Sequence, residues 1–420
     1  MWSSVHVNLF ALKRDVVSVL ERYLEFGYRG GGSGNGEGAE GMDITICHNN
    51  WYWNQKRTPR GVRNKTGEGF WTEHFQKAFS FLLRPENIRR FRKFDISDID
   101  WQLPAATADA AETQMNLSFL ENLFLDARTR RDLPLVGLWK SIQRAPRLRW
   151  VKLGIHMSLS TSSLTTMLAH SQIRSLEIER VAELEGDVLD VVRLLPMLSN
   201  LENLRVGYIR EEGSASLQVA TSVDCPNLRR LTTQFGDGPG QTVFLRGLRL
   251  PLLEFLSVTG SYSTCTFDLD TSESLISTLQ NVAGTLKEFK FDHEVKSDVI
   301  NVLPEILRVL PNLTRFYAKM RGAGTKCIFD LLQKLAKDSS LGSKLRCIRL
   351  EEYGFPFDFD MAERIVPLLE CMGPTLKEVG LGFGIAFSIR ENGEFGESSE
   401  GGWAAEGIGG HDGHAEIPRP

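Results

Sequence analysis

The chain has 420 residues, of which 42% are hydrophobic and 24% are charged, with a formal net charge of −4. This composition is that of a folded protein and excludes wholesale disorder, and the small negative charge argues against nucleic acid as the partner. No apolar run reaches the roughly 18 residues of a membrane span, and the first residues lack the basic and apolar segments of a secretion signal. We therefore expect a protein of the cytoplasm, the nucleus or both, without a membrane contact.

The first 46 residues predict two strands with a helix between them. Apolar residues alternate at Trp2-Val5-Val7 and again within residues 42–46, and residues 12–26 have the apolar spacing of a helix. Residues 28–41 are rich in glycine, which predicts a flexible insertion. We expect residues 1–46 to contribute the first repeat-like units of the fold.

Residues 48–69 form a predicted loop that combines aromatic and basic side chains. Aromatic rings beside basic groups could stack bases and hold phosphates, but one basic loop in an acidic chain favours a solvated insertion instead. The residues concerned are Trp51, Tyr52, Trp53, Lys56, Arg57, Arg60, Arg63 and Lys65.

From residue 70 to 385 the chain repeats the pattern L-x-x-L-x-L, with other apolar residues at some of the leucine positions. Eleven copies occur at intervals of 25 to 33 residues, close to the period of leucine-rich repeats. Five of the sixteen prolines stand two residues before the first apolar residue of a copy, where proline ends a helix and favours extended backbone. The copies begin at Phe91, Leu120, Leu148, Ile173, Leu201, Leu228, Leu253, Leu286, Leu313, Leu345 and Leu376.

The segments between the copies have helical periodicity, most clearly at residues 187–198, 299–310, 328–338 and 360–372. Each repeat is therefore expected to form a short strand, a turn, a helix and a return. The sequence predicts an α/β fold of irregular repeats, a leucine-rich-repeat solenoid with parallel strands on the concave face and helices on the convex face. Residues 386–420 are rich in glycine and carry a net charge of −5, which predicts a disordered tail.

The residues between the strand leucines are expected to point to the concave face, because side chains alternate along a strand. Aromatic and arginine side chains on such a face are typical anchors for a protein partner. The predicted partner-binding residues are Phe124, Trp150, Lys152, Arg205, Arg230, Phe255, Arg315, Tyr317 and Arg349.

The N-terminal region resembles the segment that follows the F-box in large fungal F-box/leucine-rich-repeat-like proteins. The similarity is carried by residues 2–7, by Tyr23-Leu24-Glu25-Phe26-Gly27 and by Met42-Asp43-Ile44, which approximate the family patterns W-S-S-hydrophobic-x-hydrophobic, W-L-E-R-S-G and P-L-D-I. The resemblance implies that the repeats recognise substrates for a cullin-type ubiquitin ligase, whose chemistry lies on other subunits.

The chain departs from this family because the L-P-x-E stretch of the F-box itself is absent. The family pattern places an F-box before Met1, so a contact with a Skp-type adaptor is expected only if such a segment is encoded upstream. Otherwise the chain is an F-box-less relative, and the sequence leaves both possibilities open.

Three functions are compatible with these sequence features. The first is a protein-binding module that selects substrates for ubiquitination, the second is a repeat scaffold unrelated to ubiquitin, and the third, more remote, is a GTPase regulator that acts through an arginine. No motif for a nucleophile, a catalytic zinc ion or a complete phosphate loop is present. We expect no enzymatic activity, no catalytic residue, no cofactor and no metal site.

Overall fold

The structure is a computed structural model of the whole chain. It describes residues 4–8, 15–29, 42–47, 77–78, 81–82, 84–99, 116–127, 141–154, 172–180, 191–192, 194–209, 222–235, 244–260, 266–267, 269–295, 302–321, 325–352, 367–368, 376–381, 385–389 and 395–397. The chain divides into two compact units, a first unit of Met1–Leu253 and a second unit of Glu254–Pro420. The expected loop at residues 48–69 and residues 30–41 of the expected glycine-rich insertion lie outside the described residues.

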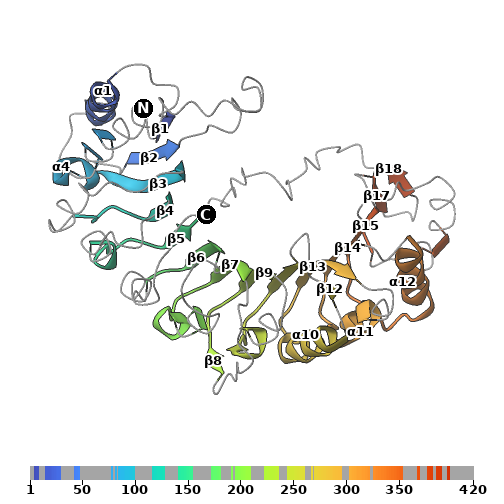
Figure 1. Cartoon of the computed structure of the whole chain (residues 1–420). Helices are drawn as coiled ribbons and strands as arrows, with labels where there is room; N and C mark the ends of the chain where they lie inside the picture. Colours follow the sequence, from blue (N-terminus) through green and yellow to red (C-terminus); the bar gives the residue numbers. More distant parts are fainter. Residues whose placement is uncertain are drawn as a thin grey trace, which may run out of the picture. The chain divides into compact units, whose positions relative to one another are not determined.

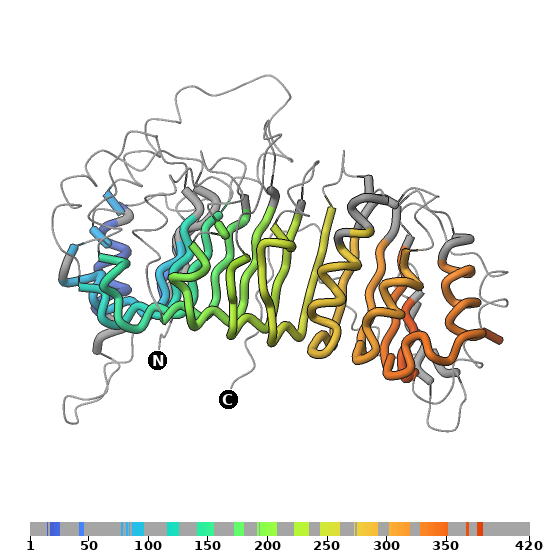
Figure 2. Tube along the Cα trace, turned by 90° about the horizontal axis from the view of Figure 1, so that it is seen from below, coloured from blue at the N-terminus to red at the C-terminus, as the bar shows by residue number. Residues whose placement is uncertain are grey.

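The first unit is built on parallel strands that pair in chain order (Figures 1 and 2). Its described helices include α1 (Val16–Arg29), α4 (Pro85–Ile88) and the short η2 (Leu195–Met197), and β8 (Val223–Asp224) pairs with β10 (Leu248–Arg249) in a separate parallel ladder. The main strands are β1 (Ser4–Asn8), β2 (Met42–Cys47), β3 (Phe91–Ile99), β4 (Asn122–Ala127), β5 (Trp150–Leu153), β6 (Ser175–Arg180), β7 (Asn203–Ile209) and β9 (Arg230–Phe235).

The second unit repeats this plan, with α-helices of 8 to 14 residues among its strands. Strands β11 (Phe255–Gly260), β13 (Glu288–Val295), β14 (Arg315–Arg321), β15 (Cys347–Glu352) and β16 (Glu378–Leu381) are parallel neighbours, and β12 (Thr266–Phe267) also pairs with β13. The helices α10 (Leu269–Val282), α11 (Val302–Val309) and α12 (Thr325–Lys337) follow one another along one side of these strands (Figure 1). Two antiparallel strands, β17 (Ile385–Ile389) and β18 (Phe395–Glu397), continue the sheet after β16.

The alternation of apolar residues along the strands builds the core. In the second unit, Leu256, Phe289, Phe316, Ile348 and Val379 stand in register on neighbouring strands, and none is more than 1% exposed. The rings of Phe289 and Phe316 stack with centroids 6.1 Å apart. Full burial of one such side chain stabilises the fold by about 1.5–3 kcal/mol, so each repeat gains its stability by stacking on its neighbours. The structure thus confirms the predicted α/β class with parallel strands and repeated strand–helix units.

The turns before the strands hold neighbouring repeats together through side-chain amides. Nδ2 of Asn227 donates a hydrogen bond to the carbonyl of Ser199 over 2.9 Å, and Nδ2 of Asn312 donates to the carbonyl of Gly284 over 3.1 Å. Each of these asparagines follows a proline that lies in the turn and precedes the first buried leucine of its strand. The P-N-L sequence therefore connects the turn to the preceding repeat in both places, and at Pro311 it also follows the end of helix α11.

Several predicted boundaries differ from the structure. Helix α1 begins at Val16 and continues to Arg29, two residues into the segment expected to be a loop. Strands β17 and β18 lie within residues 385–397, so regular structure continues past residue 386, where the disordered tail was expected to begin. Of the predicted helix at 187–198, the structure describes the η2 turn and its flanking residues. Of the predicted helix at 360–372, it describes residues 367–368.

Helix α10 was expected only from the general plan of the repeat, and its segment was not among those with the clearest helical periodicity. Its buried residues Leu275, Leu279 and Val282 have helical spacing, but its first half is rich in serine, threonine and acidic residues, several of which are weak helix formers. Packing against α11 stabilises this helix despite its weak local helix propensity, because most helical stability in proteins comes from a buried face.

Candidate protein-binding face

The strands of each unit have one buried row of side chains and one row that points to the opposite side. In β5 the residues alternate between half-buried Trp150 and Lys152 and buried Val151 and Leu153. We call the less buried side the polar face. All nine residues predicted to bind a partner lie on strands at polar-face positions, five of them in the first unit and four in the second.

In the first unit, four polar-face residues stand side by side on β4, β5, β6 and β7. The register pairs Phe124 with Lys152, Lys152 with Glu177, and Glu177 with Arg205. Nζ of Lys152 lies 4.7 Å from the centroid of the Phe124 ring, 3.5 Å from Glu177 Oε1 and 2.5 Å from Glu179 Oε1. Arg205 Nη1 lies 3.1 Å from the same Glu177 oxygen.

This arrangement gives Lys152 and Arg205 different roles. The side chain of Lys152 is 22% exposed, and although burial alone would lower its pKa, the neighbouring Glu177 and Glu179 carboxylates raise the pKa above its ordinary value. The side chain of Arg205 is 59% exposed. Lys152 therefore holds the face together, while Arg205 presents its guanidinium group to the solvent.

Trp150 stands in the neighbouring row, closer to the start of the strands. Its register partners are Asn122 on β4 and Ser175 on β6, both short, so neither covers the half-buried indole with a long side chain. Arg230 stands in the same row at the start of β9, paired in register with Asn203, and is exposed. The row thus carries an accessible aromatic ring and an accessible cation on a rigid parallel sheet.

In the second unit the predicted residues form a stack around one lysine. Lys290 on β13 lies with Nζ 5.5 Å from the Phe255 ring centroid and 4.9 Å from the Tyr317 ring centroid. The register continues from Tyr317 to Arg349 on β15 and then to Gly380 on β16. A side chain at Gly380 would come within 3.1 Å of the Arg349 side chain, so the glycine leaves room for the stem of the arginine.

Phe255 does not match the prediction of an accessible anchor. Its side chain is only 7% exposed, because the lysine of the neighbouring strand lies over the ring. Arg315 does match the expected exposure, since its side chain is 61% exposed. Its Nη1 also lies 3.6 Å from Glu288 Oε2. Tyr317 is half-buried; burial, together with the nearby Cys347 and Glu288, raises the pKa of its hydroxyl well above the ordinary value.

Several acidic residues of the polar face were missing from the predicted set. Asp95 on β3 is buried, 3.0 Å from Lys93 Nζ, and it accepts a hydrogen bond from Thr45 Oγ1 over 3.4 Å. It stands in register with Phe124, so the same alternation rule identifies it. Glu179 lies one residue beyond the six-residue pattern, so the pattern alone does not reach it.

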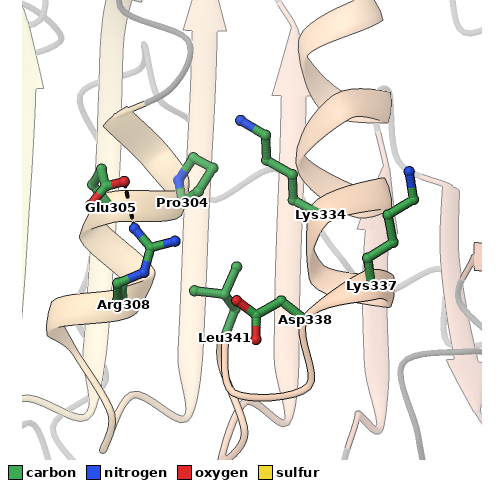
Figure 3. Close-up of a pocket in the computed structure, with 7 residues that line it drawn as sticks. All are labelled: Pro304, Glu305, Arg308, Lys334, Lys337, Asp338 and Leu341. Atoms are coloured by element: carbon green, nitrogen blue, oxygen red, sulfur yellow. Dashed lines mark hydrogen bonds and ion pairs between the residues drawn. The ribbon is translucent and has the colours of Figure 1, made fainter.

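The helix side of the second unit contains a shallow hollow between α11 and α12 (Figure 3). Its volume is about 390 Å³. It is lined by Pro304, Glu305, Arg308, Lys334, Lys337, Asp338 and Leu341, with Arg308 paired to Glu305. None of these residues was predicted to bind a partner.

Two other kinds of site are absent from the part of the chain that the structure describes. No group of three or more histidine, cysteine or acidic residues that would hold a metal ion occurs among those residues. Within the same residues, no helix is long and apolar enough to cross a membrane.

Comparison with known proteins gives little further information. No family model matches the chain, and no curated protein matches it. A crystal structure of a protein from Bacteroides fragilis is 15% identical, over 75% of this chain and 83% of that chain, with a TM-score of 0.39. At this level of similarity the match carries no argument about function.

Proposed function

We propose that the chain is a protein-binding repeat module whose partner contacts the polar face of the strands. The observation that carries this proposal is the combination, in the first unit, of half-buried Trp150 on β5 with exposed Arg205 on β7 and exposed Arg230 on β9, all within three strand spacings on the polar face of one parallel sheet. Tryptophan and arginine are the residue types that most often dominate the binding energy of protein interfaces. A rigid sheet holds them in place before the partner arrives, which reduces the entropy lost on binding.

The contacts within the face divide the predicted residues into anchors and supports. Trp150, Arg205 and Arg230 are the proposed anchors of the first unit. Phe124 and Lys152 are the proposed supports; they stand in the row of Arg205, next to the row of Trp150 and Arg230. In the second unit, Arg315, Tyr317 and Arg349 are the proposed contacts, the first two on β14 and the third on the adjacent β15.

We further propose that the bound protein is a substrate for a cullin-type ubiquitin ligase. The support for this finer statement is the sequence resemblance of residues 2–46 to the segment after the F-box of fungal F-box/leucine-rich-repeat-like proteins. The ligase would be recruited through a Skp-type adaptor bound by an F-box preceding this chain. The repeats would supply position and affinity, and no catalytic group.

Site-specific photo-crosslinking tests the binding proposal. In the test variant, a benzophenone amino acid replaces Ser175, which stands between Trp150 and Asn203 on the polar face. In the control variant, it replaces Met197 in η2, which is 46% exposed. In cells of the source organism, the Ser175 variant is expected to crosslink a defined protein that the Met197 variant does not. Trp150→Ala is expected to abolish this crosslink. Equal crosslinking from both positions would contradict the proposal.

The ubiquitin proposal needs a separate measurement on the protein captured in this way. We expect the full-length gene product to co-purify with a Skp-type adaptor and a cullin, and the captured protein to persist longer in cells that lack this chain. A captured protein with unchanged lifetime, and no adaptor in the complex, would identify the chain as a scaffold instead.

A further inference from the structure

Backbone hydrogen bonds align one residue of each repeat at the edge where the strands begin. The carbonyl of Glu121 accepts hydrogen bonds from the amides of Arg149 and Trp150, over 2.9 and 3.1 Å. The same double contact recurs from one repeat to the next, so that Glu121, Arg149, Arg174, Glu202 and Arg229 form one column across β4 to β9. The turns that lead into these strands follow one another along the lower edge of the trace in Figure 2.

Arginine is concentrated along this edge of the first unit. Arg149, Arg174 and Arg229 belong to the column itself, Arg230 follows directly, and Arg147 lies 5.2 Å from the ring centroid of Phe119 in the preceding turn. All five arginines are exposed. We call this set, Arg147, Arg149, Arg174, Arg229 and Arg230, the arginine rim.

The charge of the arginine rim exceeds that of the acidic residues in the same column. The rim contains five arginines and the column two glutamates, Glu121 and Glu202, which is a formal excess of three positive charges on a chain whose net charge is −4. Arg174 pairs with Glu202 over 3.2 Å, but both side chains are more than a third exposed, and such pairs contribute little.

The order of charges within the column is also informative. Arg149 and Arg174 are direct neighbours in the column, at the positions just before β5 and β6, with no acidic residue between them. Neighbouring strands are about 4.8 Å apart, and like charges placed opposite each other destabilise a sheet. An anionic group bound between the two guanidinium groups would relieve this repulsion.

We propose that the arginine rim binds an acidic segment of the protein partner. This inference rests on the proposed function and names the chemistry of the partner. The column spans four strand spacings, about 19 Å, which matches roughly six residues of extended peptide. Carboxylates on such a peptide fit arginine in the bidentate geometry that gives the strongest ion pairs. Trp150, the next residue after Arg149, would contact an apolar neighbour of the acidic segment.

A peptide is favoured over nucleic acid because of the two glutamates in the column. Glu202 stands between Arg174 and Arg229, and Glu121 stands beside Arg149 at the first position of the column, so both would repel an evenly spaced row of phosphates. A peptide can place a neutral or basic residue at these positions and carboxylates at the others, so that charge complementarity also sets the binding register.

Fluorescence anisotropy with the full chain tests the proposal. The probe is a labelled twelve-residue peptide rich in aspartate and glutamate, and the comparison is a single-stranded DNA of similar length. We expect saturable binding of the peptide that weakens as salt is raised. The double variant Arg149→Glu/Arg174→Glu is expected to bind about tenfold more weakly or worse.

The matched control makes the same change of charge at a separate surface, on the helix side of the second unit. Lys334→Glu/Lys337→Glu alters lysines of the hollow in Figure 3 and is expected to leave peptide affinity within about twofold, a difference below 0.5 kcal/mol. Equal or greater loss in this control would overturn the proposal, as would tighter binding of the DNA than of the peptide. If Ser175 crosslinks a partner but the peptide does not bind, the proposed function stands and this inference fails.

Discussion

Replacing Lys152 by methionine is expected to destabilise the first unit while leaving its shape unchanged. Methionine keeps much of the length of the side chain and removes the charge. Glu177 and Glu179, each only 14% exposed, then lose their shared cation on the polar face, and Arg205 remains 3.1 Å from Glu177. The contact between the Lys152 ammonium group and the Phe124 ring is lost as well.

The size of the effect follows from the burial of the pair. Breaking an exposed ion pair costs about 0.2–1 kcal/mol, whereas leaving one charge of a fully buried pair without its partner costs about 3–5 kcal/mol. The Lys152–Glu179 pair is 22% and 14% exposed and lies between these limits. With a cation–π contact of about 0.5–1 kcal/mol added, we expect a loss of about 2–3 kcal/mol.

Amide hydrogen exchange under native conditions measures this loss in the strands concerned. A change of about 2 kcal/mol corresponds to roughly 30-fold faster exchange of the most protected amides of β5 and β6. The control is Arg174→Met in the same unit, which breaks a pair with side chains 55% and 39% exposed and is expected to cost less than about 1 kcal/mol.

Two outcomes bear directly on the role of Lys152. Adding Glu179→Gln to Lys152→Met is expected to restore part of the stability, because it removes one of the two carboxylates left without the lysine. Equal exchange rates in Lys152→Met and Arg174→Met would show that the polar face is as solvated as the exposed edge. The role assigned to Lys152 as a support of the face would then be wrong.

Three further predictions concern the packing of the repeats. Gly207→Ala would place a methyl group against the Glu179 carbonyl oxygen and is expected to lower the free energy of unfolding, measured in urea, by about 3 kcal/mol or more. The control Gly284→Ala, where no atom lies within 4 Å of the added methyl group, should change this free energy by less than about 0.5 kcal/mol. Asn312→Ala removes the hydrogen bond between repeats and is expected to cost about 1 kcal/mol in the same assay; no loss would show that solvent replaces the bond. Burial, and to a smaller extent the Glu378 carboxylate, raises the pKa of the Cys347 thiol to about 11. Alkylation of this thiol at about pH 8, followed by peptide mapping, should therefore be far slower in the native protein than after unfolding, and equal rates would contradict the prediction.

Much of the fold follows from the sequence because the repeat encodes its own register. Every predicted copy of L-x-x-L-x-L coincides with a strand, since burying one face of a strand requires alternation with a period of two. The same alternation occurs at Ile385, Phe387 and Ile389 of β17, where it is short and is followed by a long segment rich in glycine and acidic residues. The composition of that longer segment led to the expectation of disorder, and it concealed the local strand signal.

The candidate site followed from the sequence only in part, because alternation gives the direction of a side chain and not its exposure. Exposure depends on side chains of the neighbouring strands, either in register or diagonally placed, which are about 30 residues away along the chain. Phe255 is covered by Lys290 of the neighbouring strand, whereas Trp150 stands between an asparagine and a serine and stays accessible. Both aromatic residues satisfy the same sequence rule.

The alternation rule, which identified the polar-face residues, missed the column residues of the arginine rim. Its column lies at the first variable position of L-x-x-L-x-L, before the strand proper, so a search for strand residues between the leucines passes over it. Its net charge also disappears in the average over an acidic chain. The structure places Arg149 directly before Trp150 and Arg174 at the start of the adjacent repeat, so that the polar face and the rim offer one partner an apolar anchor and a row of cations on the same unit. Specificity for a protein would then come from the spacing between anchor and acidic segment, since neither contact is selective alone.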